Sequence, residues 1–124
     1  MLQDSPMYSY IPAQDIARAR KFYEGQLGFT PKQEINGGVV YASAGGTAAF
    51  LYSTPNAGTS KASQAFWDVA DIDAEVAELR RRGVTFENYD MPGTDANGIT
   101  TAGGARAAWF KDSEGNILAI IQTL

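Results

Sequence analysis

The stretch from residue 15 to residue 29, DIARARKFYEGQLGF, sets the pattern from which the fold can be predicted. Asp15 is a favourable N-cap residue, apolar side chains follow it at helical spacing, and Gly28 is typical of the position just after a helix. The spacing therefore predicts a helix that begins at Asp15, ends at Gly28 and packs its apolar face against a sheet. Residues 71–84 have the same plan, with an aspartate at the start and Gly83 at the end.

Each predicted helix is preceded by one strand candidate and followed by three. The candidates are Met7–Ile11, Lys32–Ile35, Val39–Ala44, Ala48–Tyr52, Gln64–Val69, Thr85–Tyr89, Ala105–Lys111 and Ile117–Gln122. The order strand, helix, three strands thus occurs twice, which indicates either an internal duplication or two ordinary units that are similar by chance. The sequence predicts an α+β fold in one domain, residues 1–124, with βαβββ modules at about 6–54 and 62–124.

Three irregular segments lie between these predicted elements. Residues 53–60 are polar and turn-rich, so they are predicted to link the two modules. Residues 90–104 form a longer connection than is usual, and such loops often act as lids, so we predict that they cover a binding site. Residues 112–116, DSEGN, have the composition of a tight hairpin turn, and no catalytic role is predicted for their carboxylates.

Composition excludes several classes of function. A length of 124 residues favours a single domain, and a formal net charge of −4 argues against nucleic acid and anionic membrane surfaces as partners. The chain has no Cys and no His, so it lacks thiolate nucleophiles, the commonest metal ligand and the usual general base. No apolar run approaches the roughly 20 residues that span a bilayer, and the N-terminal residues lack a signal-peptide pattern, which predicts a cytoplasmic protein.

Three stretches together carry a family resemblance: residues 15–29, residues 69–74 (VADIDA) and residues 109–118 (WFKDSEGNIL). In this combination they resemble the vicinal oxygen chelate superfamily, which includes glyoxalases, bleomycin-resistance proteins and extradiol dioxygenases. The resemblance implies paired modules whose curled mixed sheets surround a cup-shaped cavity. Many members of that superfamily are dimers with cavities between the modules of two chains, and its enzymes hold a divalent metal on four strands, mostly through His and Glu. The resemblance implies that these features are to be looked for here.

The four positions that match the family's metal ligands are Tyr8, Phe50, Gln64 and Ala119. Phenol, phenyl, amide and methyl groups do not replace the imidazole and carboxylate donors that divalent ions prefer. We therefore predict that the chain has no metal site and uses no cofactor.

Aromatic side chains dominate the strands that would form the cup. Strand alternation places Tyr10 and Tyr52 on the same face as the four family positions, and it directs Trp67 to the helix side. The predicted ligand-binding residues are thus Tyr8, Tyr10, Phe50, Tyr52, Gln64 and Ala119. As a set they favour a pocket for an apolar or aromatic small molecule, because phenol and amide groups in an apolar core need partners. For any single ring, ordinary core packing is the alternative.

Three functions remain open from the sequence alone. The absent metal ligands favour a metal-free binding module, for example one that sequesters an antibiotic. The second hypothesis is a lyase-, isomerase- or dioxygenase-like enzyme with an altered, metal-independent mechanism, in which Tyr8, Tyr10, Tyr52 or Asp90 would handle protons. The third is a structural or regulatory module with a filled cavity. In each case a homodimer is predicted, because two small curled sheets leave edges and apolar area exposed.

Overall fold

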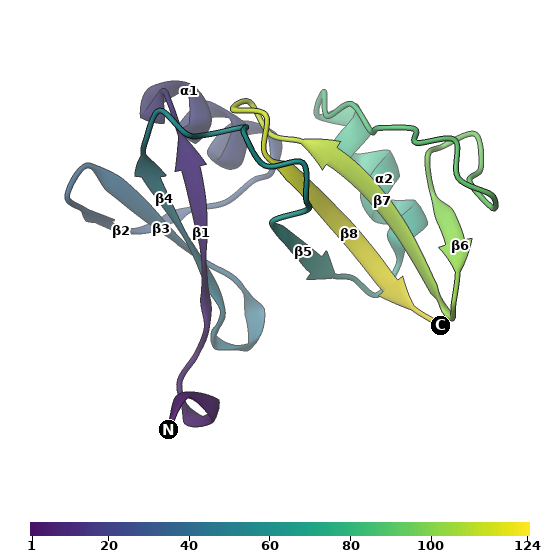
Figure 1. Ribbon diagram of the computed structural model, residues 1–124, viewed down its shortest axis with the longest axis horizontal. Helices are drawn as coiled ribbons and strands as arrows, with labels where there is room; N and C mark the ends of the chain where they lie inside the picture. The colour runs from purple at the N-terminus through teal and green to yellow at the C-terminus, as the bar shows by residue number, and fades with distance from the viewer.

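The computed structural model describes residues 1–124 and contains two βαβββ modules (Figure 1). The first module comprises β1 (Tyr8–Ala13), α1 (Ile16–Arg20), the π-helical segment η2 (Lys21–Gln26), β2 (Pro31–Ile35), β3 (Gly38–Ala42) and β4 (Ala48–Ser53), with short 3-10 turns at η1 (Leu2–Asp4) and η3 (Ala44–Gly46). The second comprises β5 (Ala65–Asp68), α2 (Ile72–Arg81), β6 (Thr100–Ala102), β7 (Ala105–Lys111) and β8 (Ile117–Thr123). The predicted α+β class and the repeated module are confirmed.

Each module forms one four-stranded mixed sheet. The strand order is β1-β4-β3-β2 in the first sheet and β5-β8-β7-β6 in the second. In both sheets the first strand pairs in parallel with the last, and the other pairs are antiparallel. β1 and β5 therefore lie at sheet edges, where one side of the strand has no partner strand.

Both helices begin where the sequence predicts. The carboxylate of Asp15 accepts a hydrogen bond from the N–H of Arg18 at 3.0 Å, and the carboxylate of Asp71 accepts one from Ala74 at 3.1 Å. The first helix widens into a π-helix over η2, which the regular helical spacing did not predict. In this segment Phe22 and Tyr23 are both buried.

The predicted strand Thr85–Tyr89 is wrong. This segment makes only an isolated bridge, from Phe86 to Phe110, while β6 (Thr100–Ala102) takes the edge position inside the segment predicted as a loop. The reason is local, because Gly103 and Gly104 have φ of +58° and +83° and form a tight hairpin between β6 and β7. A short hairpin fixes the register of β6 directly, whereas the earlier segment would have to pair across a longer connection.

One apolar core joins the two modules. It combines helix-side residues of the first sheet, such as Ile11 and Leu51, with helix-side residues of the second, such as Leu118. Trp67 also lies on the helix side, as predicted, with its ring centroid 5.8 Å from that of Phe29. Because both helix sides contribute to a single core, the outer faces of the two sheets point away from it. Neither α-helix has the length and apolar character that a membrane crossing requires.

Candidate functional site

The outer face of the first sheet carries four of the predicted site residues, and we call this group the aromatic face: Tyr8, Tyr10, Phe50 and Tyr52. Tyr10 lies opposite Phe50 in the parallel pairing of β1 with β4. The Tyr10 ring contacts Phe50 and Tyr52 edge-on, at centroid distances of 5.8 and 5.1 Å, and Phe50 stacks on Tyr52 at 6.3 Å. The structure therefore brings these rings together.

Much of the aromatic face is open. Tyr8 is 47% exposed and Tyr10 is 67% exposed. A shallow hollow of about 350 Å³ runs beside Tyr8, Tyr10 and Phe50 and is bordered by polar groups of β2 and the turn after it, including Lys32. No phenol of the aromatic face makes a side-chain hydrogen bond within the chain, whereas the buried Tyr41 donates one to Glu24.

Gln64 and Ala119 lie on the outer face of the second sheet. Ala119 is buried at the centre of that sheet, where it pairs in register with Phe66 on one side and Trp109 on the other. The N–H of Gln64 donates to the carbonyl of Ile117, which extends the β5–β8 pairing by one residue. These two residues line neither the hollow beside the aromatic face nor any cavity shared with it. Residues 90–104, predicted as a lid, do not border that hollow either.

The residues at the family's metal positions do not fit a metal ion. Their side chains are phenol, phenyl, amide and methyl, and they are divided between the outer faces of two sheets. No group of three or more His, Cys, Asp or Glu side chains is placed to hold a cation. No chemical step through a metal is therefore derived from this structure.

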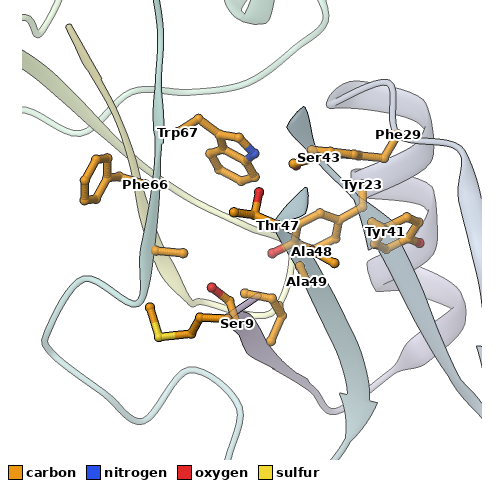
Figure 2. Close-up of a pocket in the computed structure, with 13 residues that line it drawn as sticks. Ser9, Tyr23, Phe29, Tyr41, Ser43, Thr47, Ala48, Ala49, Phe66 and Trp67 are labelled. Atoms are coloured by element: carbon orange, nitrogen blue, oxygen red, sulfur yellow. The ribbon is translucent and has the colours of Figure 1, made fainter. Parts of the chain in front are cut away.

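Sequence reasoning missed a cavity between the modules (Figure 2). It has a volume of about 180 Å³ and lies between the edge strands β1 and β5, where it is lined by helix-side residues of both sheets and also by Phe66 from the outer face of the second sheet. Figure 2 shows Phe66 and Trp67 on one side of it, with Tyr23 and Tyr41 on the other. No local pattern could have revealed it, because the lining residues come from both modules and share no spacing.

The DSEGN turn does more than reverse the chain. The side chain of Glu114 is fully buried and accepts hydrogen bonds from the N–H groups of Gln14 and Asp15, each at 2.9 Å, and from the guanidinium of Arg18. Burial would raise the pKa of Glu114, but the hydrogen bonds from Arg18, Asp15 and Ser113 outweigh it and lower the pKa to about 2. The second module thus holds the start of the first helix.

Two further residues of the turn reach the first module. Asp112 accepts a hydrogen bond from the hydroxyl of Tyr23 at 2.6 Å, and burial raises the pKa of Tyr23 well above its ordinary value. Asn116 donates to the carbonyl of Pro12 at 2.8 Å and accepts from the N–H of Gly58. We call Asp112, Glu114 and Asn116 the inter-module clamp. Its partners lie up to 104 positions away along the chain, so the sequence pattern revealed only the turn.

Comparison with known proteins places this geometry in a family. The model of the Glyoxalase/Bleomycin resistance protein/Dioxygenase superfamily matches residues 6–120. TnmS3, described as an antibiotic binding protein from Streptomyces sp. CB03234, superposes with a TM-score of 0.75 at 23% identity, covering 100% of this chain and 99% of its own. A glyoxalase/bleomycin resistance protein from Catenulispora acidiphila superposes with a TM-score of 0.70 at 22% identity, covering 96% and 98%.

A virulence protein from Salmonella typhimurium superposes with a TM-score of 0.72 at 21% identity, and the two chains cover each other completely (100% and 100%). At these identities the likeness establishes a shared fold. No curated protein sequence matches the chain.

Proposed function

Because the chain belongs to the Glyoxalase/Bleomycin resistance protein/Dioxygenase superfamily, we propose that it binds an apolar or aromatic small molecule and does so without a metal ion. The observation that carries the proposal is the aromatic face, where Tyr10, Phe50 and Tyr52 contact one another while the face stays open to solvent. TnmS3, which has the same fold, is described as antibiotic binding. Antibiotic sequestration is therefore the specific form of binding that we put first.

Energetics support a flat, apolar ligand. Aromatic pairs contribute roughly 0.5–1.5 kcal/mol each beyond the area that they bury, and several rings are available here. The hollow of about 350 Å³ is at the lower end of the size range of small-molecule sites. Lys32 at its border is a cation that would favour a ligand with an anionic substituent at one end.

The complete cup in this proposal needs two copies of the chain. One copy places its aromatic face opposite the Gln64 and Ala119 face of the other, in a symmetric homodimer. Three observations support this: both outer faces point away from the core, β1 and β5 are open sheet edges, and Tyr10 and Phe66 expose large apolar area. Gln64 would then orient the ligand through its amide, while the rings supply most of the affinity.

Enzymatic turnover is the weaker hypothesis. A tyrosine that handles protons needs a base within hydrogen-bond reach or another activating partner. Tyr8, Tyr10 and Tyr52 have no such partner among the side-chain hydrogen bonds, in contrast to Tyr23 and Tyr41, which donate to carboxylates and are used in packing.

The experiment is a titration with anilinonaphthalene sulfonate, an aromatic fluorescent dye, and with bleomycin, alongside light scattering and a turnover assay on each bound compound. We expect a dimer, saturable binding and unchanged bound compound. A monomer of 13.3 kDa at high micromolar concentration would reject the shared cup. Chemical conversion of a bound compound would favour the enzyme, and the absence of any binding would favour the filled-cavity module.

A further inference from the structure

The cavity between the modules is separate from the aromatic face. Its volume is about 180 Å³, and it is bordered by the edge strands β1 and β5, mainly by helix-side residues such as Ile11 and Ala65, with Phe66 added from the outer face. Tyr8, Tyr10 and Phe50, which line the hollow on the outer face, do not line this cavity, and Ser9 of the edge strand β1 is the one residue that borders both. A molecule in one site therefore would not occupy the other.

Four aromatic rings form a connected wall around the cavity. Tyr23 stacks on Tyr41 with ring centroids 5.7 Å apart, Phe29 lies 5.8 Å from Tyr41, and Trp67 lies 5.8 Å from Phe29. Among the other lining residues, Ala48, Ala49 and Ala65 are small, while Met7, Ile11 and Phe66 are large apolar side chains. The small side chains leave room for a ring that would pack against the aromatic wall.

The polar groups at the cavity are few and neutral, and some of them make no side-chain hydrogen bond. The hydroxyls of Tyr23 and Tyr41 are already bonded, to Asp112 and Glu24. By contrast, the hydroxyls of Ser9 and Ser43 and the indole N–H of Trp67 take part in none of the chain's side-chain hydrogen bonds. The residues that line the cavity include no charged side chain. A ligand suited to this site is therefore uncharged and carries one hydrogen-bonding group.

The volume sets the size of the ligand. An apolar cavity of roughly 150 Å³ in a protein core binds benzene. At about 180 Å³, this cavity, which is open to solvent beside the exposed side chains of Met7 and Phe66, has room for one aromatic ring with a small polar substituent.

We propose that the inter-module cavity is a second binding site, for a neutral aromatic molecule of about the size of phenol. The ring packs against Trp67 and Tyr23, and its hydroxyl bonds to Ser9 or Ser43. Because β1 belongs to the first module and β5 to the second, a molecule bound here also stabilises the contact between them. The proposal goes beyond the function proposed for the aromatic face and does not depend on it.

The test uses phenol as the probe and Trp67 as the reporter. Trp109→Phe removes the other tryptophan, so that the fluorescence of Trp67 alone is followed, and equilibrium dialysis gives the stoichiometry. We expect saturable binding of one phenol per chain and a rise in the unfolding temperature on binding. No saturable binding up to the solubility limit of phenol would overturn the proposal.

Variants locate the bound molecule. Ala65→Leu fills the cavity and is expected to weaken phenol binding at least tenfold. Ala62 is exposed and lies just before β5 in the sequence, so Ala62→Leu is expected to leave phenol binding unchanged. An unchanged far-UV circular dichroism spectrum and a cooperative urea transition show that Ala65→Leu still folds. If that variant does not fold, Trp67→Phe, read by dialysis, takes its place and is expected to weaken binding severalfold. Phenol binding that survives these changes, or that is lost in Phe50→Ala, would overturn the proposal.

A comparison of phenol with toluene tests the hydrogen bond. We expect phenol to bind more tightly than toluene, and this preference to disappear when Ser9→Ala and Ser43→Ala are combined. Equal binding of the two compounds to the unmodified chain would contradict the role of the serine hydroxyls.

Discussion

The inter-module clamp and the aromatic face differ in whether their side chains find partners inside the chain. Every polar group of the clamp is buried and paired, and no buried side-chain polar atom in the chain lacks a hydrogen bond. On the aromatic face the rings contact each other, but Tyr8 and Tyr10 stay about half or more exposed, at 47% and 67%. Groups satisfied within the chain hold the fold together, whereas an unsatisfied aromatic surface is available to a ligand or a second copy.

Among the predictions, removing Glu114 from the inter-module clamp should have the largest effect on stability. Glu114→Ala leaves the N–H groups of Gln14 and Asp15 without their acceptor and Arg18 without its partner. We expect the free energy of unfolding to fall by roughly 2–4 kcal/mol, below the value for a fully buried ion pair because Arg18 is half exposed. Urea denaturation measures it.

The matched control is Glu87→Ala, since this glutamate makes no side-chain hydrogen bond. We expect it to change stability by less than about 0.5 kcal/mol. Equal losses in the two variants would mean that the clamp does not stabilise the contact between the modules.

Acid should weaken the clamp by a somewhat smaller amount. Because the pKa of Glu114 is lowered from 4.5 to about 2 in the folded chain, the unfolded chain binds the proton more readily between these values. The stabilisation is complete above about pH 5 and is lost as the pH falls towards 2, which corresponds to roughly 2–3 kcal/mol after allowance for screening.

Urea denaturation at several pH values, compared between the unmodified chain and Glu114→Gln, isolates this residue. The exposed pair of Glu78 with Arg81 and Arg82 is present in both proteins and cancels in the comparison. Equally steep losses of stability in the two proteins would assign the acid sensitivity to other carboxylates.

The sequence predicted those parts of the molecule that depend on neighbouring residues. Asp15 and Asp71 cap helices within three residues of themselves, so both helix starts were predictable. β6 was not, because its pairing follows from the tight turn at Gly103 and Gly104, while residues 85–89 lie beside the other end of β7 and make only the bridge from Phe86 to Phe110. The partners of Glu114 lie as many as 100 positions away, so its role required the folded chain.

The same division applies to the candidate site. Strand alternation placed Tyr8, Tyr10, Phe50 and Tyr52 on one face, and in the structure the rings of Tyr10, Phe50 and Tyr52 contact one another there. It could not tell whether the two outer faces meet within one chain, because that depends on how the modules pack. Their helix sides form a common core, and this arrangement directs the outer faces away from each other.

Shortening the side chains of the aromatic face tests whether its exposed rings bind the ligand. We expect Phe50→Ala or Tyr52→Ala to weaken binding of a planar aromatic ligand by about tenfold, since both stacking and buried area are lost. Leu124→Ala, a change at an exposed apolar residue, serves as the control and should leave binding unchanged. Fluorescence titration measures the dissociation constants. Affinity unaffected by both ring truncations would mean that the ligand binds elsewhere.

Replacing Gln64 should give the smallest effect on affinity. In Gln64→Leu we expect a change in the ranking of ligands that differ in hydrogen-bonding groups, with the tightest apolar ligand bound within severalfold of its original affinity. Titration with a matched series of aromatic compounds measures this ranking. A uniform loss for every compound would instead give Gln64 a part in shaping the cup.

A mixed-dimer experiment tests the shared cup most directly. Phe50→Ala damages the aromatic face, and Gln64→Trp blocks the opposite face, so each variant alone should bind ligand poorly. When the two differently tagged variants are co-expressed, a mixed dimer contains one cup built from two unmodified faces and one built from two altered faces. We predict that mixed dimers recover native affinity at about one site per dimer. Mixed dimers that bind no better than either variant alone would contradict a cup formed between two copies.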